Sequence, residues 1–174
     1  MISHGAAQIA IPEIPSGRSD EPLDIGAVEA FYAKPFQQGE LAPPFETKTF
    51  AGAALKLADY KGKYVLLTFW RSERRETEDE LQPLKAAQSA WGKDKRLVII
   101  GLNFDDSVEI ARAYADKHEF TWTHGYPGPK SNLTMRYRLR GPTSILIGPD
   151  GRILQPDLHG PEIADALQNA LGSK

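Results

Sequence analysis

One segment, residues 64–70, strongly limits the folds open to this chain of 174 residues. It is Tyr-Val-Leu-Leu-Thr-Phe-Trp, and its polar and apolar positions do not alternate. A strand with one wet face alternates, whereas a strand covered on both faces is apolar throughout. Residues 97–102 are also apolar. We therefore predict two buried strands in a sheet that carries helices on both faces.

The segments around these strands favour an α/β sandwich with a mixed sheet. Residues 141–154 predict two strands around a Pro-Asp-Gly turn, and residues 45–57 predict extended structure. A helix is predicted from an N-cap at Ser72 to a stop at Gly92. The other predicted elements are a helix capped by Asp106 or Ser107 and ending near residue 118, a short strand over 120–123, a short helix over 131–137 and a final helix over 162–171.

Composition indicates one globular domain with some additional chain. The chain is 41% hydrophobic and 25% charged, which suffices for a core without disulfides or metal. A net charge of -2 gives no reason to expect nucleic acid as a partner. No apolar run approaches the roughly 20 residues of a spanning helix, so we predict no membrane insertion, and no signal peptide is apparent in this chain.

The chain divides into two unequal parts. Residues 1–38 begin with a stretch rich in Pro, Gly and Ser and contain a possible short strand over 24–31. We interpret them as an N-terminal arm or a linker from a preceding domain. The compact domain is predicted over residues 39–174.

Five segments carry a family resemblance: Ala42-Pro43-Pro44-Phe45, Leu55 to Leu67 with its Lys61-Gly62-Lys63 turn, Phe69-Trp70, Gly141-Pro142-Thr143 and Ile147 to Ile153. Through them the chain, from about Gly39 to Leu171, resembles the redoxins of the thioredoxin superfamily. The likeness is to TlpA-like thiol-disulfide oxidoreductases and the neighbouring AhpC/TSA proteins of bacteria. It implies a thioredoxin-like sandwich, a mixed central β-sheet flanked by helices with a redoxin-type β-α insertion. As a weaker implication, it suggests an extracytoplasmic (periplasmic) location.

The resemblance places a substituted redox site directly after the first buried strand. The family's Cys-x-x-Cys corresponds to Arg74 and Thr77, and the chain contains no cysteine. Three family positions are retained: Trp70, Glu80 and Pro142, the last at the place of the family's cis-proline. Thiol chemistry needs a thiolate, so we predict a redox-inactive domain with no catalytic residues.

Two residues of the substituted site have chemical alternatives. Thr77 could act as a nucleophile only beside a base, so we prefer a hydroxyl on the helix surface. Arg74 could reach Glu80 and satisfy a buried carboxylate, which would make an anion or acid–base site. Pairs at i, i+4 spacing, Arg74 with Glu78 and Arg75 with Asp79, give a solvated first turn as the simpler alternative.

Further candidate sites receive weaker support. An anion site would need several arginines to converge at the start of the helix, where acidic neighbours offset their charge. The histidines have no ligand spacing, so no metal or other cofactor is predicted. Residues 132–134 match a glycosylation acceptor, a triplet common by chance. The arginines are Arg71, Arg74, Arg75, Arg138 and Arg140, their neighbours Glu73, Glu76, Glu78 and Asp79, and the histidines His4, His118, His124 and His159.

These observations favour a non-catalytic module with a binding or structural role within a larger protein. The partner is unknown. Candidates are a protein or an extended peptide at a groove beside Pro142, or other domains of the same chain. The alternative from another class is a thiol-disulfide oxidoreductase or antioxidant role inherited from the family, with thiols supplied by a partner.

Overall fold

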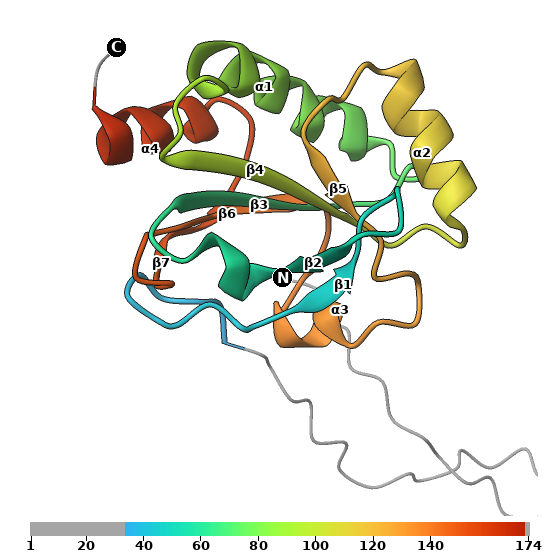
Figure 1. The fold of residues 1–174 in the computed structure, drawn as a ribbon, viewed down its shortest axis with the longest axis horizontal. Coiled ribbons are helices and arrows are strands. Elements are labelled where there is room, and N and C mark those ends of the chain that lie inside the picture. Colours follow the sequence, from blue (N-terminus) through green and yellow to red (C-terminus); the bar gives the residue numbers. More distant parts are fainter. Residues whose placement is uncertain (1–33, 173–174) are drawn as a thin grey trace, which may run out of the picture. The chain divides into compact units, whose positions relative to one another are not determined.

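A five-stranded mixed sheet forms the centre of the computed structural model, which describes residues 34–172 (Figure 1). The strand order is β5-β4-β3-β6-β7, with β3, β4 and β5 parallel and β6 and β7 antiparallel to their neighbours. The mixed sheet of an α/β fold is confirmed. The predicted strand over residues 24–31 lies outside the described residues. The strands are β3 (Tyr64–Trp70), β4 (Leu97–Asn103), β5 (Thr123–Gly125), β6 (Thr143–Ile147) and β7 (Ile153–Leu158).

One face of the sheet is covered by three helices. These are α1 (Glu76–Trp91), α2 (Val108–Lys117) and α4 (Glu162–Leu171). Helices α1 and α4 pack against each other, and Leu66 and Trp70 of β3 point into the same apolar cluster (Figure 1). None of the helices in residues 34–172 is long and apolar enough to cross a membrane.

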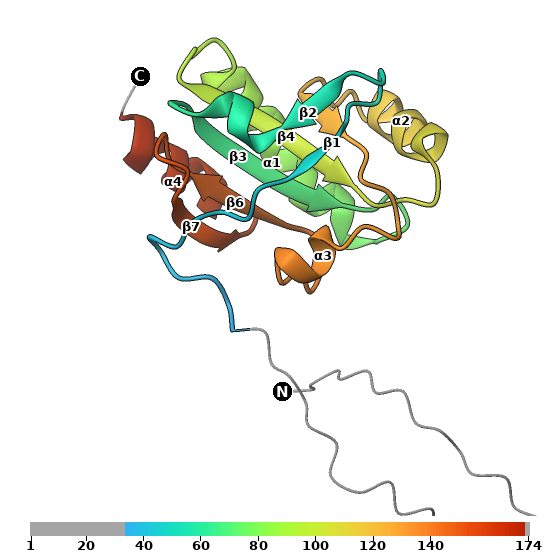
Figure 2. The same cartoon turned by 60° about the horizontal axis from the view of Figure 1, so that its bottom comes forward.

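The opposite face is covered by smaller elements. They are the antiparallel pair β1 (Glu46–Lys48) and β2 (Ala54–Lys56), the 3-10 turn η1 (Leu57–Tyr60) and the short helix α3 (Leu133–Arg136). Val65, Leu67 and Phe69 of β3 point into the second apolar cluster under these elements. Because β3 is buried from both sides, its sequence has no polar alternation. Figure 2 shows that the segment before β1 passes beside β7, where Leu41 forms a bridge with Arg152.

Two predicted boundaries were wrong near the site. Ser72 does not cap α1, which begins at Glu76 after an Arg75 N-cap without a side-chain hydrogen bond. The strand predicted over 120–123 is β5 (Thr123–Gly125) instead, because Thr123 to Gly125 pair with residues 100–102 of β4. Ser107 does cap α2, since its hydroxyl accepts a hydrogen bond from Ile110 N–H.

Candidate functional site

The substituted redox site lies in the loop between β3 and α1. This loop, Arg71–Arg75, starts directly after Trp70, which is buried at the end of β3. Strand β6 runs antiparallel beside β3 and places Thr143 opposite Phe69. The chain segment ending at Pro142 therefore arrives next to the start of the loop.

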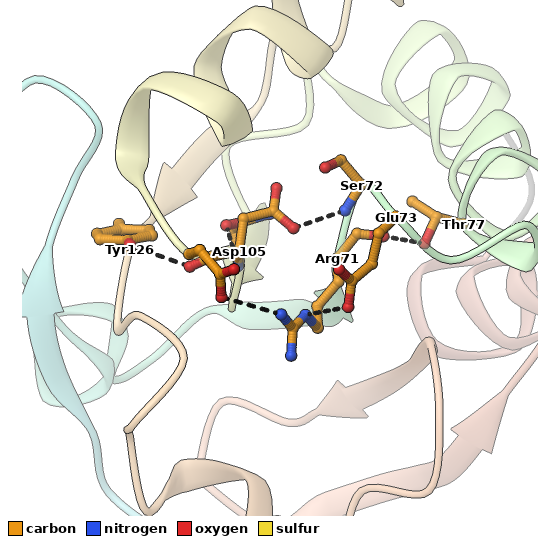
Figure 3. A network of polar contacts seen from close by, with 8 residues as sticks. Arg71, Ser72, Glu73, Thr77, Asp105 and Tyr126 are labelled. Atoms are coloured by element: carbon orange, nitrogen blue, oxygen red, sulfur yellow. Dashed lines mark hydrogen bonds and ion pairs between the residues drawn. The ribbon is translucent and has the colours of Figure 1, made fainter.

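A buried carboxylate on the neighbouring strand end fixes the loop (Figure 3). Asp105 follows β4 and is only 3% exposed. Its Oδ1 accepts a hydrogen bond from Ser72 N–H at 2.8 Å, and its Oδ2 accepts one from Asn103 Nδ2 at 3.0 Å. The Tyr126 hydroxyl donates to the Asp105 carbonyl at 3.0 Å. The capping role predicted for Ser72 fails because its backbone is engaged here, in the loop before the helix.

The first arginine of the loop is neutralised locally (Figure 3). Arg71 Nε lies 3.1 Å from Glu73 Oε1, and Arg71 Nη2 lies 3.3 Å from Asp106 Oδ1. Arg138 pairs elsewhere, with Glu40, and stacks over the Phe36 ring. Two of the five arginines considered as an anion site, Arg71 and Arg138, are therefore paired with carboxylates.

Thr77 is completely buried, so the predicted surface hydroxyl is wrong. Its Oγ1 donates to the Arg71 carbonyl at 2.6 Å and ties the first turn of α1 to the start of the loop (Figure 3). A hydroxyl that donates to a backbone carbonyl has no base to remove its proton, which argues against a nucleophile. Thr77 thus fills the second cysteine place as a structural residue, while Arg74 at the first place is exposed.

Glu80 pairs with a histidine, not with Arg74. Its Oε1 lies 2.9 Å from His159 Nδ1, and its Oε2 accepts a hydrogen bond from Gly160 N–H at 3.4 Å. The pair predicted with Arg74 fails because Arg74 lies before the helix begins and faces solvent. The i, i+4 pairs fail for the same reason, and Glu78 lies 3.6 Å from His118 Nδ1 instead.

His159 is held between two carboxylates. Its Nε2 lies 3.3 Å from Asp157 Oδ1, and Asp157 also accepts a hydrogen bond from the Thr143 hydroxyl at 3.0 Å. Burial lowers the pKa of His159, but the hydrogen bond and charge of Glu80, with the charge of Asp157, outweigh burial and raise it overall. Both ring nitrogens of His159 are therefore engaged by carboxylates. The cluster of Glu80, Asp157 and His159 thus connects α1, β7 and the segment before α4.

Pro142 does not have the cis bond that the resemblance implied. All peptide bonds among residues 34–172 are trans. Gly141 precedes Pro142 directly and is exposed, and the trans form is the ordinary preference of an X–Pro bond. Within the described residues, neither the N–H nor the carbonyl of Gly141 forms a hydrogen bond. The retained proline therefore borders an unpaired stretch of backbone.

The model of the AhpC/TSA family matches residues 38–155, more than half of the chain. The chain belongs to the AhpC/TSA family. Among relatives, the thioredoxin-like protein YneN of Bacillus subtilis is 33% identical over 89 residues, 49% of this chain and 51% of YneN. That match spans only about half the length of YneN. The thiol-disulfide oxidoreductase ResA of Bacillus thuringiensis is 25% identical over 133 residues, 76% of each protein.

Solved structures give the same thioredoxin-like fold. A thiol:disulfide interchange protein from Bacteroides sp. is 26% identical with a TM-score of 0.71, covering 79% of this chain and 93% of that one. The thioredoxin domain of a thiol-disulfide oxidoreductase from Bacteroides vulgatus is 27% identical with a TM-score of 0.68, covering 78% of this chain and 96% of that one. The thioredoxin-like redoxin fold is thereby confirmed.

Two further features bear on what this family member could bind. Residues 34–172 contain no group of three or more His, Asp or Glu side chains that could hold a metal ion. A mainly apolar cavity of about 210 Å³ lies between η1, the start of β3 and the end of β6, and Val65 and Ile147 are among its lining residues. It is therefore at the other end of these strands from the substituted redox site.

Proposed function

We propose that this redoxin domain binds an extended peptide segment beside Pro142 and performs no thiol chemistry of its own. One observation carries the proposal. Gly141, which is separated from the start of β6 by Pro142 alone, offers an exposed, unpaired backbone N–H and carbonyl. An extended peptide can pair with such groups by adding a short strand, so that main-chain hydrogen bonds supply affinity.

The fixed geometry of the neighbouring loop supports binding. Asp105 and Thr77 hold the backbone of the Arg71–Arg75 loop from two sides. A preorganised surface loses less conformational entropy when a peptide binds. Arg74 and Arg75 are exposed on this loop, beside Glu76 and Asp79, so both signs of charge are present for side-chain contacts.

Thiol exchange would require a partner. The chain has no cysteine, and disulfide exchange proceeds through attack by a thiolate. We therefore assign this domain the docking step alone. An oxidoreductase role inherited from the family would depend on thiols supplied by another chain. The family resemblance also favours an extracytoplasmic location, which fractionation of cells expressing the full parent protein would test.

A displayed library of random heptapeptides provides the test of binding. We expect selection on the native chain to yield peptides that shift the amide resonances of Gly141 and Thr143. The variant Gly141→Pro, which lacks the N–H, should weaken the selected peptides at least tenfold. Gly141→Ala is the matched control, because no atom lies within 4 Å of a Cβ added there and the N–H is kept. Failure to select any peptide, or equal affinity for Gly141→Pro and the native chain, would contradict the proposal.

A further inference from the structure

The apolar cavity of about 210 Å³ lies at the ends of β3 and β6 that are remote from the substituted redox site. Its lining comes from the segment before β1, from residues 57–63 and from the turn between β6 and β7. Val65 and Ile147, which pair across β3 and β6, belong to it as well. Since Val65 lies five residues before Trp70, the cavity is about 17 Å from the substituted loop along β3.

The cavity has room for a small apolar group. A cavity of about 150 Å³ lined by apolar side chains is known to bind benzene, so the space here is sufficient for one phenyl ring. Leu41, which is among the lining residues, is 64% exposed. A bound apolar group would cover part of this side chain, and the hydrophobic effect would favour its binding.

Backbone hydrogen bonds hold the walls of the cavity together. The Gly62 N–H donates to the Pro149 carbonyl at 2.9 Å, which joins the turn after η1 to the turn between β6 and β7. The Ala42 N–H donates to the Gly151 carbonyl at 3.0 Å, which fixes the segment before β1 to the same turn. The cavity is therefore formed without a ligand, and binding would need little rearrangement of the backbone.

The charged residues of the cavity leave an excess of positive charge. Lys61 and Lys63 are exposed, and within residues 34–172 neither forms an ion pair. Asp150 is the only carboxylate among the described lining residues, and Arg152 engages it. Asp150 Oδ1 accepts the Arg152 N–H at 3.0 Å, and its Oδ2 lies 3.7 Å from Arg152 Nε. The charge of Asp150 is thus already offset, whereas the two lysines are available to an anion.

The hydroxyl of Tyr60 adds a donor to the two lysines. Within the described part of the chain, this hydroxyl has no hydrogen-bond partner. Burial, and to a smaller extent the charge of Asp59, raise the pKa of Tyr60, so the hydroxyl keeps its proton at neutral pH. Lysine ammonium groups only donate hydrogen bonds. The polar group of a ligand must therefore accept hydrogen bonds and carry negative charge, as a carboxylate does.

We propose that this cavity binds a small monocarboxylate whose compact apolar body enters the cavity and whose carboxylate pairs with Lys61 and Lys63. A mainly apolar pocket with a few polar groups that fix the orientation of the ligand is the usual form of a small-molecule site. The site lies at the opposite end of β6 from Gly141, and it does not depend on the peptide-binding proposal.

Titration of phenylacetate into the isotopically labelled native chain, followed by NMR, tests the site. We expect saturable shifts of the Val65 and Gly148 amide resonances in the millimolar range or below, while those of Gly141 and Thr143 stay unchanged. Phenylacetamide has the same ring without the charge and should bind at least threefold more weakly, as expected for exposed ion pairs. No saturation at tens of millimolar phenylacetate, or equal affinity for the two compounds, would overturn the proposal. So would shifts of the same amides that depend on protein concentration alone, because they would assign the cavity to a second copy of the chain.

Two sets of variants separate the charge from the cavity. The double variant Lys61→Gln, Lys63→Gln should bind phenylacetate at least threefold more weakly and phenylacetamide as before. Lys93→Gln, Lys95→Gln is the matched control, because these exposed lysines do not line the cavity and their loss should leave both affinities unchanged. Ala58→Leu, at an exposed position of η1 that lines the cavity, should weaken both compounds at least threefold. Native affinity for phenylacetate in the Lys61→Gln, Lys63→Gln variant or in Ala58→Leu would contradict the proposal.

Discussion

Removing the buried hydroxyl of Thr77 should loosen the Arg71–Arg75 loop. In Thr77→Val, the Arg71 carbonyl loses the hydrogen bond of 2.6 Å that Oγ1 now donates. A buried group left without its partner costs about 1–3 kcal/mol. The same carbonyl still accepts Arg74 N–H at 3.3 Å, so we expect the lower part of that range, about 1–2 kcal/mol. For a protein of this size, that corresponds to a Tm lower by about 3–6 °C.

Hydrogen exchange distinguishes the effect of losing the Thr77 hydroxyl from the effect of losing its methyl group. Thr77→Ser keeps the hydroxyl and removes one methyl, for about 1 kcal/mol of stability. Both variants therefore lower Tm, but only Thr77→Val should release the loop. Exchange of the Arg74 amide, which bonds to the Arg71 carbonyl, should be about 5–30 times faster in Thr77→Val than in Thr77→Ser. Native Tm together with native exchange in Thr77→Val would refute this reasoning.

Three other changes have expected outcomes. Asp105→Ala leaves the Ser72 N–H without its acceptor and should lower the free energy of unfolding by about 1.5–3 kcal/mol in denaturant titrations. Arg74→Ala should change that free energy by no more than about 0.5 kcal/mol, because Arg74 is exposed and is not paired with Glu80. A larger loss of stability would instead support an ion pair between Arg74 and Glu80. The folded-state pKa of His159 is raised by Glu80, so its contribution to stability is complete below the unfolded pKa of about 6.5 and is lost as pH rises through the folded pKa. Thermal melts from pH 5 to pH 9 should therefore show the Tm advantage of the native chain over His159→Gln shrinking at high pH, and a constant difference would contradict this.

Local patterns were sufficient for most of the fold. The uninterrupted apolar run predicted β3 (Tyr64–Trp70) because burial on both faces removes alternation, and helical spacing with a glycine stop predicted α4 (Glu162–Leu171). The start of α1 could not be predicted in this way. Ser72 is a good N-cap by residue type, but its backbone is used by Asp105, which is 33 residues away in sequence.

The candidate site was predicted only in part, because its contacts also join segments that are distant in sequence. The positions of Arg74, Thr77 and Glu80 follow from the family resemblance, but their partners depend on contacts between distant segments. His159 is 79 residues from Glu80, and no local pattern marks that pair. Asp105 carried a weak signal, a polar Asn-x-Asp directly after a buried strand. The trans bond before Pro142 corrects an expectation that came from the family and not from these residues.

The central claim is that the chain keeps the scaffold of a redoxin without its thiol chemistry, and an insulin-reduction assay tests it most directly. In the presence of dithiothreitol, the native chain should not increase the rate above dithiothreitol alone. The double variant Arg74→Cys, Thr77→Cys should raise the rate at least tenfold, since the helix start that lowers a thiol pKa is retained. Acceleration by the native chain would contradict the claim that its chemistry is lost, and an inactive but folded double variant would contradict the claim that its scaffold is kept.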